Sequence, residues 1–327
     1  YTGLTFIIGC PLLFAGIFSA IDLIQDNPHL RLIDAMQKGQ RYAEKEELTA
    51  ESISLALSKL KDLTVDATLL GVSTFTGEPI VVPDHFVNQI VLVLGTTGAG
   101  KTITLRRFYE RAIVKGYPLI VVDGKPTDDN VKWLSTLAEQ YGKKFYGFNC
   151  ATFSHYDPLA NGGYSELKDK IISLKDNWEN DYYRSIAEDY LQTTFEVLQL
   201  QNKPFDLKRV VECLNYDVLV ATSRAIKNAD LSARVASLQN YERKDITGLQ
   251  AHLNLLIHSE LGQYFIVDES AITIPKIIEQ DAVVYFALPA LRFPSFSKVL
   301  GKLVINDIKA AIDRNNDGNK RIFMVFD

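Results

Sequence analysis

The segment Gly95–Thr102 carries the residues whose types and spacing could do chemistry. It fits the pattern G-x-x-x-x-G-K-[ST] of a phosphate-binding P-loop, with the residues Gly95, Thr96, Thr97, Gly98, Ala99, Gly100, Lys101 and Thr102. The glycines let the backbone wrap around a phosphate so that its N–H groups point inward. We expect Lys101 to reach the β- and γ-phosphates of ATP and the Thr102 hydroxyl to ligate Mg²⁺. The alternative is a glycine-rich turn that binds no ligand.

The sequence on either side of this loop predicts the context that a P-loop requires. Ile90–Leu94 is a continuous apolar run leading into the loop, which is typical of a parallel strand covered on both faces. Ile103, Leu105 and Phe108 follow among charged residues and predict a helix, whose N-terminus adds the positive end of its dipole. Strand, loop and helix together favour a nucleotide site over an inert turn.

Two aspartates are candidates for the Walker B carboxylate, which holds the water shell of Mg²⁺. Asp123 follows the apolar run 118–122, and Asp327 follows the apolar run 322–326. Ligands of open α/β sheets bind at the carboxyl ends of the strands, so both positions are suitable. The local pattern does not separate the two. Lys125 follows Asp123 closely, and both are possible near-site residues.

Composition sets broad limits on the class of protein. The chain has 327 residues, 47% of them apolar, which suggests about two domains and some membrane content. A net charge of −5 gives no global basic surface for nucleic acid, although a local groove can still be basic. The cysteines Cys10, Cys150 and Cys213 lie far apart, which favours free thiols in a reducing compartment.

The N-terminal segment Tyr1–Ile21 contains no charged residue. As a helix it would be about 31 Å long, close to the thickness of the hydrocarbon core of a bilayer. We therefore expect a transmembrane helix, with a buried core helix or a signal-peptide remnant as alternatives. Basic residues in the following segment favour a cytoplasmic C-terminal side. A helical connector is expected over residues 22–64.

The rest of the chain divides by its hydrophobic patterns. Over residues 65–163 a hairpin signal and alternating strands and helices predict the first part of a nucleotide-binding domain. Helical patterns replace this alternation over residues 164–275, which we interpret as an inserted, mildly acidic all-helical domain. Strand and helix patterns return over 276–327 and predict the second part of the nucleotide-binding domain, incomplete at its C-terminus.

The ordered set of motifs resembles the type IV coupling proteins, which are TraD/TraG-type ATPases of conjugative DNA transfer in the HerA–FtsK superfamily. The set comprises Gly95–Thr102, Asp123-Gly124-Lys125, Tyr156-Asp157-Pro158-Leu159, the helical insertion and the final apolar strand ending in Asp327. The resemblance covers nearly the whole chain from about residue 65. It implies an α/β fold with a RecA-like P-loop NTPase core, an inserted all-helical domain and an N-terminal transmembrane helix.

The resemblance also implies roles for individual residues. In that family the late strand carries Walker B, which makes Asp327 the catalytic carboxylate beside Lys101 and gives Thr102 and Asp327 to Mg²⁺. A catalytic glutamate would follow Asp327 directly, with a sensor residue and an arginine finger further on. We therefore expect this chain to be part of a longer protein, able to bind ATP but lacking full hydrolysis by itself.

At the level of the whole protein, the resemblance implies a homo-oligomeric ring, hexameric in relatives. ATP hydrolysis would move DNA or a relaxase–DNA complex to type IV secretion channel proteins at the bacterial inner membrane, with the ATPase domain in the cytoplasm. Two alternatives are an ATP-gated platform that recruits substrate without pumping it and a chromosomal DNA translocase of the FtsK or HerA type. A metabolic kinase is disfavoured by the expected membrane helix and by the long gap between Lys101 and Asp327.

Overall fold

The computed structural model describes residues 66–73, 78–87, 90–96, 98–150, 154–265, 267–314 and 320–327. Contacts within the chain define two compact units, Tyr1–Val91 and Leu92–Asp327. In the first unit, β1 (Ala67–Val72) pairs antiparallel with β2 (Pro79–Pro83), and the short helix α4 (Asp84–Val87) follows. The hairpin that the sequence predicts ahead of the P-loop is thus confirmed.

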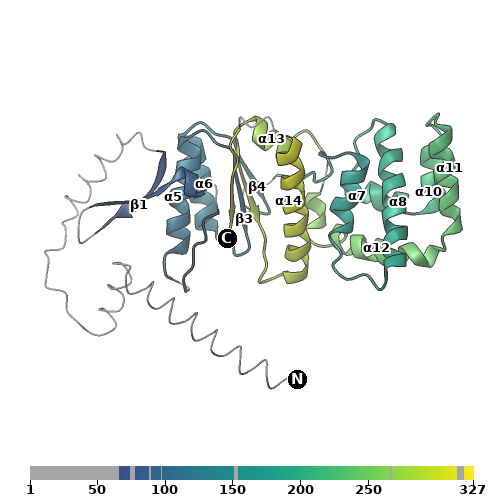
Figure 1. Ribbon diagram of the computed structural model, residues 1–327, viewed down its shortest axis with the longest axis horizontal. Helices are drawn as coiled ribbons and strands as arrows, with labels where there is room; N and C mark the ends of the chain where they lie inside the picture. The colour runs from purple at the N-terminus through teal and green to yellow at the C-terminus, as the bar shows by residue number, and fades with distance from the viewer. Residues whose placement is uncertain are drawn as a thin grey trace, which may run out of the picture. The chain divides into compact units, whose positions relative to one another are not determined.

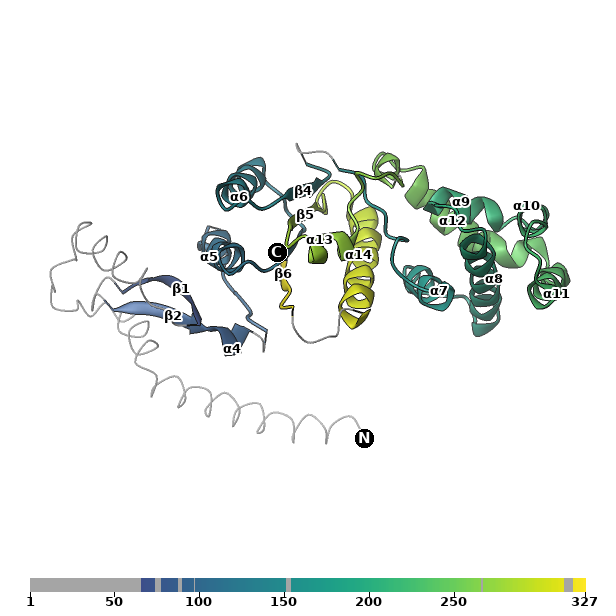
Figure 2. The same ribbon diagram turned by 90° about the horizontal axis from the view of Figure 1, so that it is seen from above.

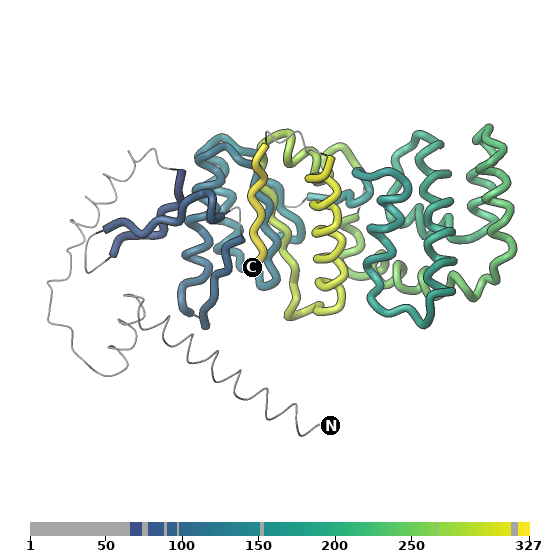
Figure 3. The backbone as a smooth tube through the Cα atoms, viewed as in Figure 1, coloured from purple at the N-terminus to yellow at the C-terminus, as the bar shows by residue number. Residues whose placement is uncertain are grey.

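The second unit is built on a four-stranded parallel sheet. Its strands lie in the order β4 (Phe145–Phe148), β5 (Val283–Ala287), β3 (Leu119–Asp123) and β6 (Phe323–Phe326). Every residue of β3 and β5 is buried, because helices cover both faces of the sheet, as the continuous apolar runs predict. The end of the chain runs beside β3 although about 200 residues separate them in sequence (Figure 3).

Helices lie on the two faces of this sheet. Figure 2 shows α5 (Lys101–Val114) and α6 (Asp128–Gln140) on one face and α13 (Ile274–Glu279) and α14 (Pro294–Arg314) on the other. Side chains alternate accordingly along β3, so that Leu119 and Val121 pack with α5 and α6 while Ile120 and Val122 join the core on the opposite face. The predicted α/β class with a parallel sheet is confirmed.

One strand that the sequence predicts is not formed. Ile90–Leu94, expected as the strand that enters the P-loop, has no regular secondary structure. A strand requires a neighbour that takes up its N–H and C=O groups, and none of the strands in the described ranges pairs with this segment. Three of its side chains are consequently largely exposed, with Ile90 at 88%, Leu92 at 77% and Leu94 at 80%. An apolar run specifies burial only where a partner is present.

Helices α7 to α12, which we call the helical segment, come next after β4 (Figure 1). They are α7 (Tyr164–Ile172), α8 (Asp181–Leu200), α9 (Leu207–Cys213), α10 (Tyr216–Ser223), α11 (Ala229–Ser237) and α12 (Arg243–Ile257). Side chains of Asn180, Asp206, Asn215 and Asn228 accept hydrogen bonds from backbone N–H groups at four helix starts, which stabilises each start. Helix α7 packs against α14, so the segment shares a core with the sheet.

In the part of the chain that the structure describes, no helix is both long and apolar enough to cross a bilayer. The transmembrane helix expected over Tyr1–Ile21 and the connector expected over 22–64 lie outside the described residues. Cys213 is a buried free thiol, as the spacing of the cysteines predicts, and Cys10 lies outside the described residues.

Candidate nucleotide-binding site

The described residues of the P-loop form a tight turn that depends on glycine. Gly98 and Gly100 have φ angles of 82° and 84°, which lie in the left-handed region that glycine adopts without strain. At Gly95 a side chain would be crowded, because a Cβ there would lie 3.1 Å from the Cβ of Ala99. Gly100 is the N-cap of α5, so the unpaired N–H groups of the first helical turn face the loop. The loop therefore has the curvature of a phosphate cradle.

The Lys101 side chain closes back over this loop. Its Nζ donates hydrogen bonds to the carbonyl oxygens of Gly95 and Thr96, each at 2.9 Å. Both acceptors are neutral, and a charged phosphate oxygen forms a stronger hydrogen bond with an ammonium group. Thr102 is the second residue of α5 and is half-buried. Thr97 lies outside the described residues.

Asp327 follows β6 at the edge of the sheet where the strands end. The backbone N–H of Gly124 donates to the Asp327 carbonyl at 2.8 Å, and the Asp327 N–H donates to the Val122 carbonyl at 3.0 Å. Partial desolvation raises the pKa of the exposed Asp327 carboxyl, the charge of Asp123 raises it further, and the Lys101 ammonium lowers it. The lysine and the terminal aspartate, distant in sequence, thus act on each other electrostatically.

Asp123 ends the neighbouring strand but has a different environment. It is 3% exposed, and both of its carboxylate oxygens accept hydrogen bonds from the protein. The backbone N–H of Lys125 donates to Oδ1 at 2.7 Å, and the Tyr285 hydroxyl donates to Oδ2. Lys125 itself is exposed. The structure therefore separates the two candidate carboxylates, one enclosed by protein donors and the other exposed and within electrostatic range of Lys101.

A buried polar network behind the loop was not predicted from the sequence. Asn130 of α6 donates from Nδ2 to the Tyr285 hydroxyl at 3.5 Å and accepts from Nε of Arg106 at 3.2 Å. The Arg106 guanidinium also stacks over Trp133, 4.7 Å from the ring centroid. The one signal available was a tyrosine inside an apolar strand, because a buried tyrosine hydroxyl needs a hydrogen-bond partner.

Tyr109 of α5 also lies near this edge of the sheet. Burial raises the pKa of its hydroxyl, and the negative charges of Asp327 and Asp123 raise it further. The side chain is fully buried, and its ring lies in tilted contact with Trp133. Two residues of α5 are therefore within electrostatic range of the strand-end carboxylates: Lys101 of Asp327, and Tyr109 of both Asp327 and Asp123.

The segment Tyr156-Asp157-Pro158-Leu159 lies on the other face of the sheet. The Tyr156 hydroxyl donates to the Asp307 carboxylate at 2.8 Å inside the core. The Leu159 N–H donates to the Asp157 carboxylate at 3.0 Å. Burial raises the pKa of Asp157 to about 6, and the charge of Asp307 contributes, while backbone hydrogen bonds and Lys170 oppose the shift. Tyr156 and Leu159 of this motif belong to the core that the sheet shares with the helical segment.

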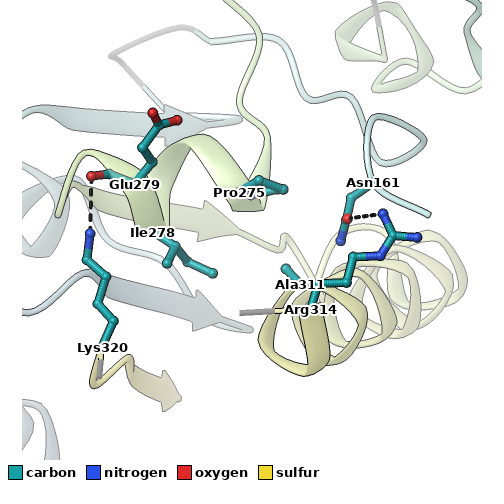
Figure 4. A pocket seen from close by; sticks show the side chains of 7 residues that line it. All are labelled: Asn161, Pro275, Ile278, Glu279, Ala311, Arg314 and Lys320. Carbon is teal, nitrogen blue, oxygen red and sulfur yellow. Dashed lines mark hydrogen bonds between the residues drawn. The ribbon is translucent and has the colours of Figure 1, made fainter. Parts of the chain in front are cut away.

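A cavity of about 430 Å³ lies at the C-terminal end of α14 (Figure 4). Arg314 and Lys320 line it, but both cations already have carboxylate partners: Arg314 pairs with Glu166, and Lys320 pairs with Asp281 at 3.0 Å. Arg314 also donates to the Asn161 side-chain oxygen at 3.1 Å. The cavity is at the edge where the strands begin, so it is separate from the P-loop.

The parallel sheet, the glycine-dependent loop at the start of α5 and the flanking helices define the class: an α/β fold with the core of a RecA-like NTPase. No protein-family model matches the sequence, and no curated protein is detectably similar to it. The chain is similar in structure to VirB4 of Thermoanaerobacter pseudethanolicus, with a TM-score of 0.50 at 15% identity, over 80% of this chain and 67% of that one. This likeness establishes the fold.

Lower similarity extends to the bacterial conjugative coupling protein TrwB. The form TrwBΔN70 in complex with sulphate has a TM-score of 0.48 at 13% identity, over 87% of this chain and 65% of that one. TrwB in complex with the non-hydrolysable GTP analogue GDPNP has a TM-score of 0.48 at 14% identity, over 82% and 62%. The chain thus spans about two thirds of the length of these proteins.

Proposed function

We propose that this chain is the nucleotide-binding part of an ATPase that serves a type IV secretion or conjugation system. The observation that carries the proposal is the convergence at one sheet edge of the loop at the start of α5, Lys101 and Asp327. The VirB4-like fold supports the same assignment. Each residue of the site then has a role that follows from its position.

The phosphates of ATP would lie in the loop Gly95–Thr102. The N–H groups at the start of α5 supply hydrogen bonds, and the helix dipole favours a negative ligand there. Lys101 would leave the carbonyls of Gly95 and Thr96 and pair with the β- and γ-phosphates. Its role in turnover is to neutralise charge that develops on the transferred phosphoryl group.

The donors present fit a magnesium ion. The Thr102 hydroxyl and the Asp327 carboxylate are hard oxygen ligands, which Mg²⁺ prefers, and Asp327 lies close enough to Lys101 for their charges to interact. When bound, Mg²⁺ would neutralise charge on the phosphates. The chain's own contribution is to hold these two donors in place. The glutamate that would orient water for attack on the γ-phosphate belongs to the sequence after Asp327 in the coupling-protein pattern.

The wider function rests on the same proposal. Residues 164–275 would form an all-helical domain inserted between the two parts of the nucleotide-binding domain, 65–163 and 276–327. Tyr1–Ile21 would anchor the protein in the inner membrane with the ATPase part in the cytoplasm. Subunits would assemble into a ring, hexameric on the coupling-protein pattern, and move DNA or a relaxase–DNA complex toward the secretion channel.

Replacement of one lysine tests the nucleotide site. Lys101→Ala is expected to abolish binding of a fluorescent ATP analogue while circular dichroism shows the fold retained. Lys143→Ala is a matched control, because the Lys143 ammonium also donates to two backbone carbonyls, those of Tyr117 and Asp281, at 3.0 and 2.6 Å. Those carbonyls lie where β3 and β5 begin, away from the loop. Unchanged affinity in Lys101→Ala would contradict the proposal.

The motor function requires a separate experiment on the whole protein. We expect DNA to stimulate its ATP hydrolysis and single-molecule tracking to show movement along DNA. If the protein binds and hydrolyses ATP but is neither stimulated by DNA nor moves on it, the recruitment platform is the correct function and the motor is not.

A further inference from the structure

A continuous series of polar contacts connects the P-loop helix to the end of β3. Arg106 of α5 donates to Asn130 at 3.2 Å, Asn130 donates to the Tyr285 hydroxyl at 3.5 Å, and that hydroxyl donates to Asp123. Three of the four side chains are almost fully buried: Tyr285 is 0%, Asn130 1% and Asp123 3% exposed. Buried polar groups of this kind fix one geometry, because each loses its partner if the others move.

The contacts continue from Asp123 to Asp327 through the backbone. Asp123 accepts from the N–H of Lys125 at 2.7 Å, which holds the turn after β3 in one conformation. Within that turn the Gly124 N–H donates to the Asp327 carbonyl at 2.8 Å. The Cβ that a larger residue would carry at Gly124 would lie 3.5 Å from the same carbonyl oxygen. The two strand ends are therefore locked together by a turn that depends on the Asp123 side chain.

We propose that Tyr285, with Asn130 and Arg106, is a positioning residue that sets the place of Asp327 relative to Lys101. The inference rests on the proposed nucleotide site and extends it to residues that touch neither phosphate nor metal. Arg106 lies on the helix that begins at Lys101, and Asp123 lies on the strand that pairs with β6. The network ties these two elements to each other across α6 and β5.

The physical reason is the precision that a metal site requires. Mg²⁺ demands a nearly ideal octahedral arrangement at short ligand distances, and an exposed carboxylate at the end of an edge strand is poorly held by itself. Residues behind the ligands commonly supply that order, and their loss costs about 10- to 100-fold in metal affinity. Tyr285 performs this role through Asp123 and the turn at Gly124.

The test measures nucleotide affinity with and without Mg²⁺ by titration with a fluorescent ATP analogue. Tyr285→Phe removes only the hydroxyl. We expect affinity in EDTA to stay within about twofold of wild type, whereas the apparent affinity for Mg²⁺ in the presence of nucleotide falls about tenfold. If Tyr285 had a structural role alone, the nucleotide affinity in EDTA and the apparent Mg²⁺ affinity would fall together, and that outcome would overturn the proposal. An unchanged apparent Mg²⁺ affinity would overturn it as well.

Tyr156→Phe is the matched control. Tyr156 is also fully buried, and its hydroxyl also donates to a buried carboxylate, that of Asp307 at 2.8 Å. This variant should leave both affinities unchanged. A second test uses Arg106→Ala, at the partly exposed end of the network. Arg107→Ala is its neighbour control, since Arg107 pairs at 3.2 Å with Glu110 of the same helix, and these side chains are 48% and 42% exposed. Arg106→Ala should lower the apparent affinity for Mg²⁺ in the presence of nucleotide, and Arg107→Ala should not.

Failure of this inference is distinguishable from failure of the proposed function. If Lys101→Ala abolishes nucleotide binding but Tyr285→Phe and Arg106→Ala leave the Mg²⁺ dependence at the wild-type level, the site stands and the positioning role is wrong. If Lys101→Ala binds nucleotide as wild type does, the site itself is wrong and the network has no ligand to position.

Discussion

Lys170 and Asp307 form an ion pair at 2.8 Å whose side chains are 2% and 1% exposed. It joins α7, the first helix of the helical segment, to α14 on the face of the sheet. The Lys170 ammonium also donates to the carbonyls of Pro158 and Asn161, at 2.7 and 3.0 Å, and Asp307 accepts from Tyr156. The three donors of Lys170 thus all have acceptors, which is the condition under which a buried charge is tolerated.

Breaking this pair from one side should be costly. Lys170→Met leaves the Asp307 carboxylate buried without its countercharge, and we expect a loss of about 3–5 kcal/mol in the free energy of unfolding, measured by urea denaturation. The double variant Lys170→Met/Asp307→Leu should be less destabilised than Lys170→Met, because no uncompensated charge remains.

Lys298→Met is the control. Lys298, which like Asp307 is on α14, pairs at 2.9 Å with Asp176 of the loop between α7 and α8, but the side chains are 67% and 46% exposed, so its loss should cost far less. Equal losses in the two single variants would contradict the prediction.

The raised pKa of Asp157 predicts a pH dependence of stability. Burial moves it from 3.8 to about 6 in the folded chain, so between these values the folded state binds more protons than the unfolded state. The free energy of unfolding should therefore fall as the pH rises from about 4 to about 6, by about 3 kcal/mol for this one group. Asp157→Asn carries no charge and should lack this loss. The difference between Asp157→Asn and wild type should grow across this window and level off above it; parallel pH curves would show that Asp157 titrates normally.

The two strand-end aspartates should respond in opposite ways to the same substitution. Asp327→Asn changes an exposed carboxylate and should leave the urea midpoint unchanged, while the apparent Mg²⁺ affinity with nucleotide falls at least about tenfold. Asp123→Asn disturbs hydrogen bonds to a buried charge and should lower the free energy of unfolding by about 2 kcal/mol. The apparent Mg²⁺ affinity with nucleotide should fall less in Asp123→Asn than in Asp327→Asn. The reverse pattern would assign the metal to Asp123.

Much of the fold could be predicted because it depends on local patterns. The runs that became β3 and β5 are apolar except for Asp123 at the end of β3, and the helix after the P-loop begins where Gly100 and Lys101 indicate. Ile90–Leu94 has an equally apolar sequence but formed no strand, because strand formation depends on a neighbour and not on composition. Local sequence therefore predicted the candidate strands, and the pairing within the sheet decided which of them formed.

The supporting residues of the site could not be predicted for the same reason. Arg106, Asn130 and Tyr285 belong to three separate elements, and only the strand order β5-β3-β6 brings them beside Asp123 and Asp327. Likewise, the sequence around Lys170 gives no sign that its partner is Asp307. The P-loop was visible because one short segment contains its whole motif, whereas the network exists only once the sheet has formed.

The core that joins the sheet to the helical segment has a consequence for how the molecule unfolds. Phe286 and Val122 of the sheet, Leu303 of α14 and Leu191 of α8 belong to one continuous apolar cluster. Among the described residues this cluster is continuous from the sheet to the helical segment, and the Lys170–Asp307 pair lies within the same region. The helices should therefore melt together with the sheet in a single calorimetric transition, and motion in one would be transmitted to the other as a rigid displacement without a hinge.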